Sequence, residues 1–353
     1  MVELQTPPPR IYVWWLTFVT ALATVLALVT PGYAPSTRIA QAAPGDPTPA
    51  AAEQGMVQIR TIVNYQNVVG FGSGVILNPD GIVLTCNHVV AGADTINATV
   101  VGTGQTFRGQ LLGFDRTDDI AVIQLVGAGG LPTAPIGDSN QVNVGDPVVS
   151  LGNANSSGGV SQEVGRVTSL GANISADDDL TGSSEQLTGL IAMAAPLRPG
   201  DSGGPVVNSA GQVIGLNVAA SVNYRLGAPT GKGFAIPINR ALAIAGQIQS
   251  RSGSDTVHIG PPALLGIGVG TAQQAASGGV VVRDVLHGTP AEQAGLRPGD
   301  VINSLDGVAL SNATDLTSVL DRHYPGDVVN LVWQDQTGQQ RTAKLTLAPG
   351  PSG

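Results

Sequence analysis

The sequence has few cysteines and few charges. Cys86 is the one cysteine, which excludes an intramolecular disulfide framework and the zinc modules that need several cysteines. Charged residues make up only 12% of the 353 residues and the net charge is -9, so a nucleic-acid partner lacks an electrostatic basis. The chain has instead 48 glycines and 24 prolines, a composition that favours short strands and tight turns over long helices.

Residues 11–29 form an uncharged, mostly apolar stretch. At ~1.5 Å per residue, a helix of this length nearly spans a bilayer core of ~30 Å. We therefore interpret residues 1–52 as a membrane anchor followed by a flexible tether rich in proline and alanine. The alternative is a secretory signal cleaved near Ala42, because residues 40–42 read A-Q-A. Both interpretations place the rest of the chain outside the cytoplasm, in a periplasmic or extracellular space.

Short strands separated by turns dominate residues 53–250. Residues 78–81 read N-P-D-G, a strong turn signal, and the glycines of residues 70–74 predict another turn. This pattern favours an antiparallel sandwich or barrel over alternating strands and helices. A helix is predicted at residues 241–249 from the spacing of its apolar positions. Strands are predicted at residues 57–63, 75–77, 82–84, 120–125, 148–151, 164–170 and 212–217.

A polar linker at residues 251–255 separates this part from a second β-rich module, which we place at residues 256–350. Thr314 is the predicted cap of a helix at residues 315–322. Strands of the second module are predicted at residues 280–282, 301–305, 328–333 and 342–347.

A serine lies between glycines in residues 198–205, which read R-P-G-D-S-G-G-P. Gly200 and Gly203 can take backbone angles that other residues avoid, so the loop can turn its amides inward. Two amides aimed at one point form a cradle for the negative oxygen of an acyl-transfer transition state. Because a serine hydroxyl needs a base to take its proton, the loop implies a histidine and an acid elsewhere.

Both are found upstream of the serine. His88 follows an apolar strand, and Asp118 and Asp119 stand directly before the strand at residues 120–125. Adjacent residues that enter a strand point to opposite sides, so only one of the two aspartates can face His88. An acid in that position holds the imidazole in the tautomer that a general base requires.

No metal site or cofactor is predicted. Cys86 and His88 are weak evidence for a metal because no second pair of ligands lies near them, and we interpret Cys86 as a small buried residue. Asp177, Asp178 and Asp179 fall in a polar stretch between residues 170 and 190. We interpret it as a solvated surface loop, since the regular spacing of a calcium loop is absent.

Residues 200–204 also satisfy G-x-S-x-G, the nucleophile elbow of α/β-hydrolases. That motif passes from a strand into a helix, and its histidine follows the serine in the chain. Here a Gly-Gly-Pro run at residues 203–205 blocks a helix at once. The histidines after the serine lie in the linker or the second module, namely His258, His287 and His323.

The order His, Asp, Ser resembles that of trypsin-like serine proteases, and most closely of their HtrA/DegP branch. The matching motifs are T-C-N-H-V-V around His88, D-D-I-A-V around Asp119 and R-P-G-D-S-G-G-P around Ser202. Residues 231–237, G-K-G-F-A-I-P, are similar to the end of that branch's catalytic domain. Residues 294–301, A-G-L-R-P-G-D-V, are typical of its PDZ domain.

The resemblance covers roughly residues 53–348 and implies a mainly β fold, with two six-stranded β-barrels, the active site between them and then one PDZ domain. It implies that His88 is the general base, Asp119 its orienting acid and Ser202 the nucleophile. The amides of Gly200 and Ser202 would form the oxyanion hole.

The second module contributes a peptide-binding loop by the same resemblance. Leu264, Leu265, Gly266 and Ile267 are similar to the loop whose amides hold a peptide's C-terminal carboxylate, with the peptide adding as a strand beside it.

We expect an exported, membrane-tethered serine endopeptidase that cleaves unfolded or damaged proteins and binds peptide C-termini through its PDZ domain. A homotrimer is expected by analogy with the family. The alternative is a peptide-binding chaperone or scaffold whose protease site is secondary or silent, because relatives can adopt inactive arrangements of the oxyanion loop.

Two positions carry expectations of their own. Asp201 departs from the branch, whose members usually have asparagine there, and we expect Arg198 or Lys232 to neutralise its buried carboxylate. Pro196 matches the residue that forms the floor of the primary specificity pocket in the family. Without an acid there to pair a buried cation, cleavage after small or medium apolar residues is expected.

Overall fold

The computed structural model describes residues 48–65, 67–154, 159–178, 183–219, 224–227, 232–274, 278–351 and 353. The apolar stretch at residues 11–29 and the cleavage position at Ala42 lie outside these ranges. No helix within the described ranges has the length and apolar character to cross a membrane. The anchor and the signal peptide stay predictions.

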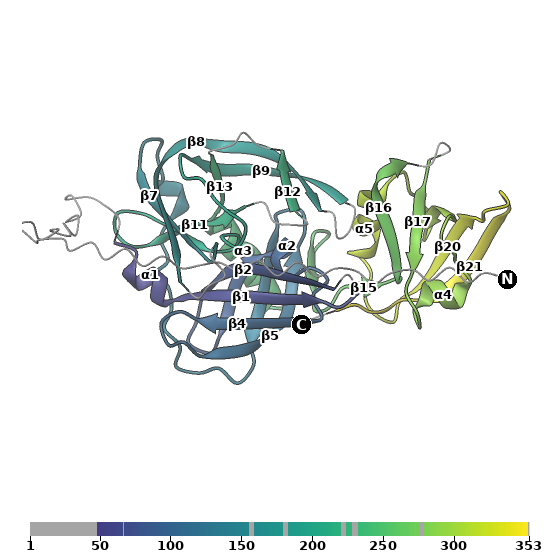
Figure 1. Ribbon diagram of the computed structural model, residues 1–353, viewed down its shortest axis with the longest axis horizontal. Helices are drawn as coiled ribbons and strands as arrows, with labels where there is room; N and C mark the ends of the chain where they lie inside the picture. The colour runs from purple at the N-terminus through teal and green to yellow at the C-terminus, as the bar shows by residue number, and fades with distance from the viewer. Residues whose placement is uncertain are drawn as a thin grey trace, which may run out of the picture. The chain divides into compact units, whose positions relative to one another are not determined.

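The first barrel is a closed sheet of six antiparallel strands in the order β5-β4-β1-β2-β3-β6, closed by pairing of β5 with β6 (Figure 1). Short helices flank it, α1 (Ala50–Gln54) before β1 and α2 (Asn87–Val90) after β3. The strands are β1 (Met56–Val63), β2 (Val68–Ile76), β3 (Ile82–Cys86), β4 (Thr95–Val100), β5 (Thr106–Asp115) and β6 (Ile120–Leu125).

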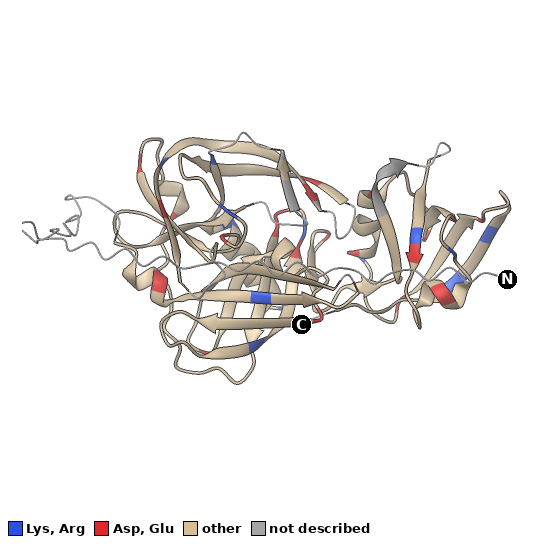
Figure 2. Cartoon of the chain, viewed as in Figure 1, with Lys and Arg blue, Asp and Glu red and all other residues tan. Residues whose placement is uncertain are grey.

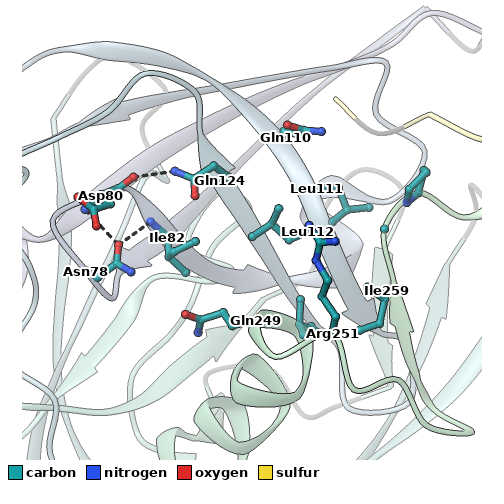
Figure 3. Close-up of a pocket in the computed structure, with 13 residues that line it drawn as sticks. Asn78, Asp80, Ile82, Gln110, Leu111, Leu112, Gln124, Gln249, Arg251 and Ile259 are labelled. Atoms are coloured by element: carbon teal, nitrogen blue, oxygen red, sulfur yellow. Dashed lines mark hydrogen bonds between the residues drawn. The ribbon is translucent and has the colours of Figure 1, made fainter.

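The turn between β2 and β3 forms as its N-P-D-G sequence predicts. The Asn78 side-chain oxygen accepts hydrogen bonds from the amides of Asp80 (3.2 Å) and Ile82 (3.1 Å), and Gly81 has φ +86° (Figure 3). The turn predicted at residues 70–74 is wrong, because these residues belong to β2. Their glycines make room for neighbours, since a Cβ on Gly72 would lie 2.4 Å from Val89 Cγ1.

The second barrel repeats this arrangement in the order β8-β7-β10-β11-β13-β9, closed by pairing of β8 with β9. A short strand, β12 (Tyr224–Gly227), adds to the edge of β8. Residues 170–190, predicted as a surface loop, largely form the β8–β9 hairpin instead. Asp177 lies in β8, and Asp179 lies outside the described residues. The strands are β7 (Pro147–Gly152), β8 (Ser161–Asp178), β9 (Ser183–Met193), β10 (Pro205–Val207), β11 (Val213–Val218) and β13 (Gly233–Pro237).

Helix α3 (Ile238–Gln249) begins directly after Pro237, three residues earlier than predicted. Its buried face consists of Ile238, Ala241, Ile244, Ala245 and Ile248, and these side chains join a core cluster that includes residues of both barrels. The helix therefore connects the two barrels through apolar packing.

Strand β14 (Val257–Ile259) falls in the range that we assigned to the second module, yet it pairs with β5 of the first barrel. Its His258 is 1% exposed and stacks on Phe114 with ring centroids 4.9 Å apart. β14 therefore extends the sheet of the first barrel.

The second module has its own sheet and its own core cluster. Helix α5 is capped by Asn312, whose side chain accepts the amide N–H of Asp315 at 2.9 Å, and not by Thr314 as predicted. Its elements are β15 (Ala263–Leu264), β16 (Ile267–Gln274), β17 (Val280–Val285), α4 (Pro290–Ala294), β18 (Val301–Leu305), β19 (Val308–Ala309), α5 (Ala313–Leu320), β20 (Val328–Gln334), β21 (Gln340–Thr346) and β22 (Ala348–Pro349).

Candidate active site

The serine loop folds tightly because two of its glycines adopt left-handed backbone angles. Gly200 has φ +100° and Gly203 has φ +78°. The Ser73 amide donates to the Ser202 carbonyl at 2.8 Å, which ties the loop to the first barrel. A Cβ on Gly203 would lie 2.4 Å from Thr85 Oγ1, so only glycine lets the loop approach β3 this closely.

His88 lies in α2, directly after β3, and its side chain is 4% exposed. Its Nδ1 is 2.7 Å from Oδ2 of Asp119. The backbone N–H of His88 donates to the other carboxylate oxygen of Asp119 at 2.9 Å. These two contacts fix both the position and the orientation of the imidazole relative to the acid.

Asp119 is held in a turn whose backbone is unusual for a residue other than glycine. Its φ is +54°, its side chain is 1% exposed, and its amide donates to the Arg116 carbonyl at 3.2 Å. Asp118 points elsewhere, and one of its carboxylate oxygens lies 3.1 Å from Nη1 of Arg240. Of the two candidate acids, the structure brings Asp119 to His88.

The Ser202 hydroxyl is engaged with the backbone of Ala219. It donates to the Ala219 carbonyl at 3.0 Å and accepts the Ala219 amide at 3.1 Å. A hydroxyl has one proton, so donation to His88 requires that proton to turn away from the Ala219 carbonyl.

Two backbone donors beside the serine are available to a ligand. Within the described part of the chain, the N–H groups of Gly200 and Ser202 donate to no protein acceptor. The Gly200 carbonyl is turned away and accepts hydrogen bonds from Ser73 Oγ (2.9 Å) and the Asn153 amide (3.2 Å). Free amides on either side of Asp201 are the donors that an oxyanion hole requires.

Within the described residues, neither Arg198 nor Lys232 forms the expected ion pair with Asp201, although the charge of Arg198 still acts on its carboxylate. The Arg198 guanidinium pairs with Glu163, and Lys232 is exposed. The Asp201 carboxylate instead accepts the hydroxyl of Ser161 (2.5 Å) and the backbone amide of Arg198 (2.9 Å). Ser161 lies far from the serine loop in the sequence, and no local pattern marked it as part of the site.

Cys86 adjoins the His88–Asp119 pair, and one ligand atom of each of the three residues lies within 4.8 Å of the others. The Cys86 thiol is fully buried and donates to the Asn217 carbonyl at 3.4 Å. Burial and the nearby Asp119 carboxylate raise the pKa of this thiol well above its ordinary value, so it stays protonated at neutral pH.

The predicted carboxylate loop of the second module borders an apolar groove of about 430 Å³. Its apolar lining includes Leu264, Leu265 and Ile267 together with Leu316 and Leu320 of α5. Residues of the first barrel line it too, among them Tyr65, Asp94 and Arg116. The N–H groups of Leu265 and Gly266 make no hydrogen bond within the described part of the chain, while their carbonyls accept the amides of Ala291 and Leu286 (2.9 Å each). The groove therefore offers apolar walls and free backbone donors.

Comparisons with known proteins agree with this geometry. Residues 72–216 match the trypsin-like peptidase domain family, and residues 263–346 match the PDZ domain family. The chain is 35% identical to a Synechocystis protein named as serine protease HhoA, over 81% of this chain and 69% of that protein. It is 32% identical to the serine protease Do-like HtrA of Lactobacillus helveticus, over 78% and 68%. A relative from Haemophilus influenzae, described as a periplasmic serine protease, is 33% identical over 80% and 59%.

The two barrels and the paired His88 and Asp119 beside the Ser202 loop define a trypsin-like serine protease with a PDZ domain. The chain belongs to the HtrA/DegP family of these proteases.

Proposed function

We propose that this protease is an exported endopeptidase that cleaves unfolded or damaged proteins through an acyl-enzyme on Ser202. The observation that carries the proposal is the His88–Asp119 contact of 2.7 Å in a buried site beside the Ser202 loop. A buried acid in contact with a histidine near a serine is the arrangement that makes a hydroxyl nucleophilic at neutral pH.

In the proposed mechanism the Ser202 hydroxyl attacks the substrate carbonyl and passes its proton to Nε2 of His88. The negative oxygen accepts hydrogen bonds from the N–H groups of Gly200 and Ser202. His88 then gives the proton to the leaving amine, and the acyl group stays on Ser202 until water, activated by the same histidine, removes it. Asp119 holds the imidazole in place and stabilises its charged form.

The PDZ domain would bind substrate or regulatory peptides by their C-termini at Leu264, Leu265, Gly266 and Ile267. The apolar groove beside α5 supports apolar last residues in such peptides. The word periplasmic in the description of the Haemophilus influenzae relative supports export. The proposal also includes membrane tethering and a homotrimer. The apolar stretch at residues 11–29 supports the tethering, and analogy with the family supports the homotrimer.

The domain limits are part of the proposal as well. We place the end of the protease domain after Ile259 rather than at residue 250, because β14 pairs with β5. The PDZ domain then begins near Ala263, the first residue of β15.

Incubation of the soluble part of the chain with a denatured protein tests the function. We expect cleavage by the wild type and its loss in Ser202→Ala, with both proteins equally folded by circular dichroism. A wild type that protects the denatured protein from aggregation without cleaving it would overturn the protease proposal in favour of a chaperone.

A further inference from the structure

Asp201 carries a carboxylate that is almost completely shielded from water, with 1% of the residue exposed. No lysine or arginine of the described ranges forms an ion pair with it. Arg198, the nearest cation in the loop, is paired with Glu163. A buried carboxylate that lacks a cation needs hydrogen-bond donors.

Ser161 supplies one of these donors from a different element. Its hydroxyl accepts the Ala154 amide at 3.2 Å, which leaves its own proton for Oδ1 of Asp201 at 2.5 Å. This is the short distance of a charge-assisted O–H···O⁻ bond. Ser161 is the first residue of β8 and is itself 5% exposed.

The neighbouring strand leaves space for this contact. Gly152, at the end of β7, pairs with Ser161, and a Cβ on Gly152 would lie 2.0 Å from Oδ1 of Asp201. The Asp201 carboxylate thus fills the space that the Cβ of any residue other than glycine would occupy at position 152. Together, β7, β8 and the serine loop form a pocket that holds one carboxylate.

The anchored carboxylate fixes the backbone around it. Its Oδ2 accepts the Arg198 amide at 2.9 Å, and the Asp201 amide donates back to the Arg198 carbonyl at 3.0 Å. Gly200 and Ser202 flank Asp201 in the chain, so the direction of their free N–H groups depends on how Asp201 is held. The Ser161 hydroxyl joins this turn to β8 through the carboxylate of Asp201, the residue that stands between the two free N–H groups in the chain.

We propose that Ser161 is a positioning residue for the oxyanion hole: its hydroxyl anchors Asp201 in place of a cation and so aims the N–H groups of Gly200 and Ser202. The inference rests on the proposed catalytic function of Ser202. It assigns to β8 a direct part in assembling the active site.

Steady-state kinetics of Ser161→Ala on a peptide substrate tests the proposal. We expect kcat to fall on the order of 10²-fold, the loss typical of one missing oxyanion donor, with KM little changed. The inhibition constant of a peptide aldehyde, which forms a tetrahedral adduct in the same hole, should rise by a similar factor. If Ser161 served stability alone, Ser161→Ala would lower the melting temperature but would leave kcat and the inhibition constant of the aldehyde unchanged.

Two further variants make the test specific. Glu163 lies two residues after Ser161 in β8 and pairs with Arg198 of the serine loop. Glu163→Gln removes this ion pair and should keep kcat within about threefold of the wild type. Ser161→Ala in an Asp201→Asn background should cost less than tenfold, because a neutral amide does not need the hydroxyl as the carboxylate does.

An unchanged kcat in a folded Ser161→Ala protein would overturn the proposal, as would an equal loss in both backgrounds. Either result leaves the proposed function standing if Ser202→Ala is inactive. Undiminished cleavage by Ser202→Ala would instead refute the proposed function itself.

Discussion

His88 and Asp119 are joined twice, once through the ring and once through the backbone. Nδ1 of His88 is 2.7 Å from one oxygen of the Asp119 carboxylate, and the His88 amide donates to the other oxygen at 2.9 Å. One acid therefore sets both the tautomer of the ring and the position of the turn that carries it.

Asp119→Asn should lower turnover on the order of 10⁴-fold, because an amide in this place favours the wrong tautomer of His88. Asp118→Asn is the matched control. Its carboxylate is partly exposed and pairs with Arg240, so we expect a loss within about tenfold, equivalent to ~1.4 kcal/mol in the barrier. Measured kcat values for the two variants test which aspartate orients His88. A large loss of kcat in Asp118→Asn would contradict the assignment of Asp119.

Cleavage should occur after small or medium apolar residues such as Val, Ala or Leu. Leu197 packs close to Gly233, where a Cβ would lie 3.0 Å from Leu197 Cγ, and Pro196 brings no carboxylate to this place. A buried Lys or Arg of the substrate would therefore lack a partner. Mass spectrometry of the fragments of a denatured protein, with Ser202→Ala as the blank, maps the cut sites. Predominant cuts after Lys or Arg would refute this specificity.

The sequence predicted the architecture well because its strong signals are local. The turn at residues 78–81 and the spacing of apolar residues in α3 appear in the structure within a few residues of where they were expected. Strands β4 and β5 escaped prediction because polar residues interrupt their apolar ones, at half-buried positions in β4 and at exposed positions in the first half of β5. The motifs predicted His88, Asp119 and Ser202 as site residues, and the structure shows the contact between His88 and Asp119.

Pairings between distant segments could not be predicted in this way. Ser161 meets Asp201 because β7 and β8 bring the two together, and no pattern within either segment encodes that contact. The same reason applies to β14, whose partner β5 lies before the whole second barrel. The cap of α5 was misplaced by two residues, because both Asn312 and Thr314 are acceptable caps by sequence.

Asp201→Asn should be more thermally stable than the wild type at neutral pH. Burial raises the pKa of Asp201 above its ordinary value of 3.8, although bonds from Ser161 and Arg198 oppose this. The folded state then binds the proton more tightly than the unfolded chain. The free energy of unfolding of the wild type consequently falls as pH rises from about 3.8 through the raised pKa, and this loss is absent in the variant.

Melting temperatures of both proteins over a pH series provide the measurement. The difference in favour of Asp201→Asn should shrink as the pH falls toward 3.8, while the titration of Asp115 cancels because both proteins share it. A variant less stable than the wild type at pH 7 would show that the ionised carboxylate is stabilising.

The PDZ groove should bind peptides that end in a free carboxylate after an apolar residue. Amidation of that carboxylate should weaken binding about tenfold or more, because charge-assisted bonds from backbone amides are lost. Ile267→Asp should weaken binding too, whereas Val308→Asp, at a position 43% exposed and outside the groove lining, should not. Fluorescence anisotropy with a labelled peptide measures all three, and equal affinity for the amidated peptide would contradict this use of the groove.

Strand β14 has a consequence for how the chain is made. The edge of β5 near Asp115 stays open during synthesis until Val257 has been added, after the entire second barrel. Folding that proceeds from the N-terminus therefore cannot complete the first sheet before the second barrel exists. The pairing of β14 with β5 joins segments far apart in the sequence, so it is expected to form late. Truncation at residue 250 would leave the nascent edge permanently unpaired, exposing backbone groups that favour aggregation.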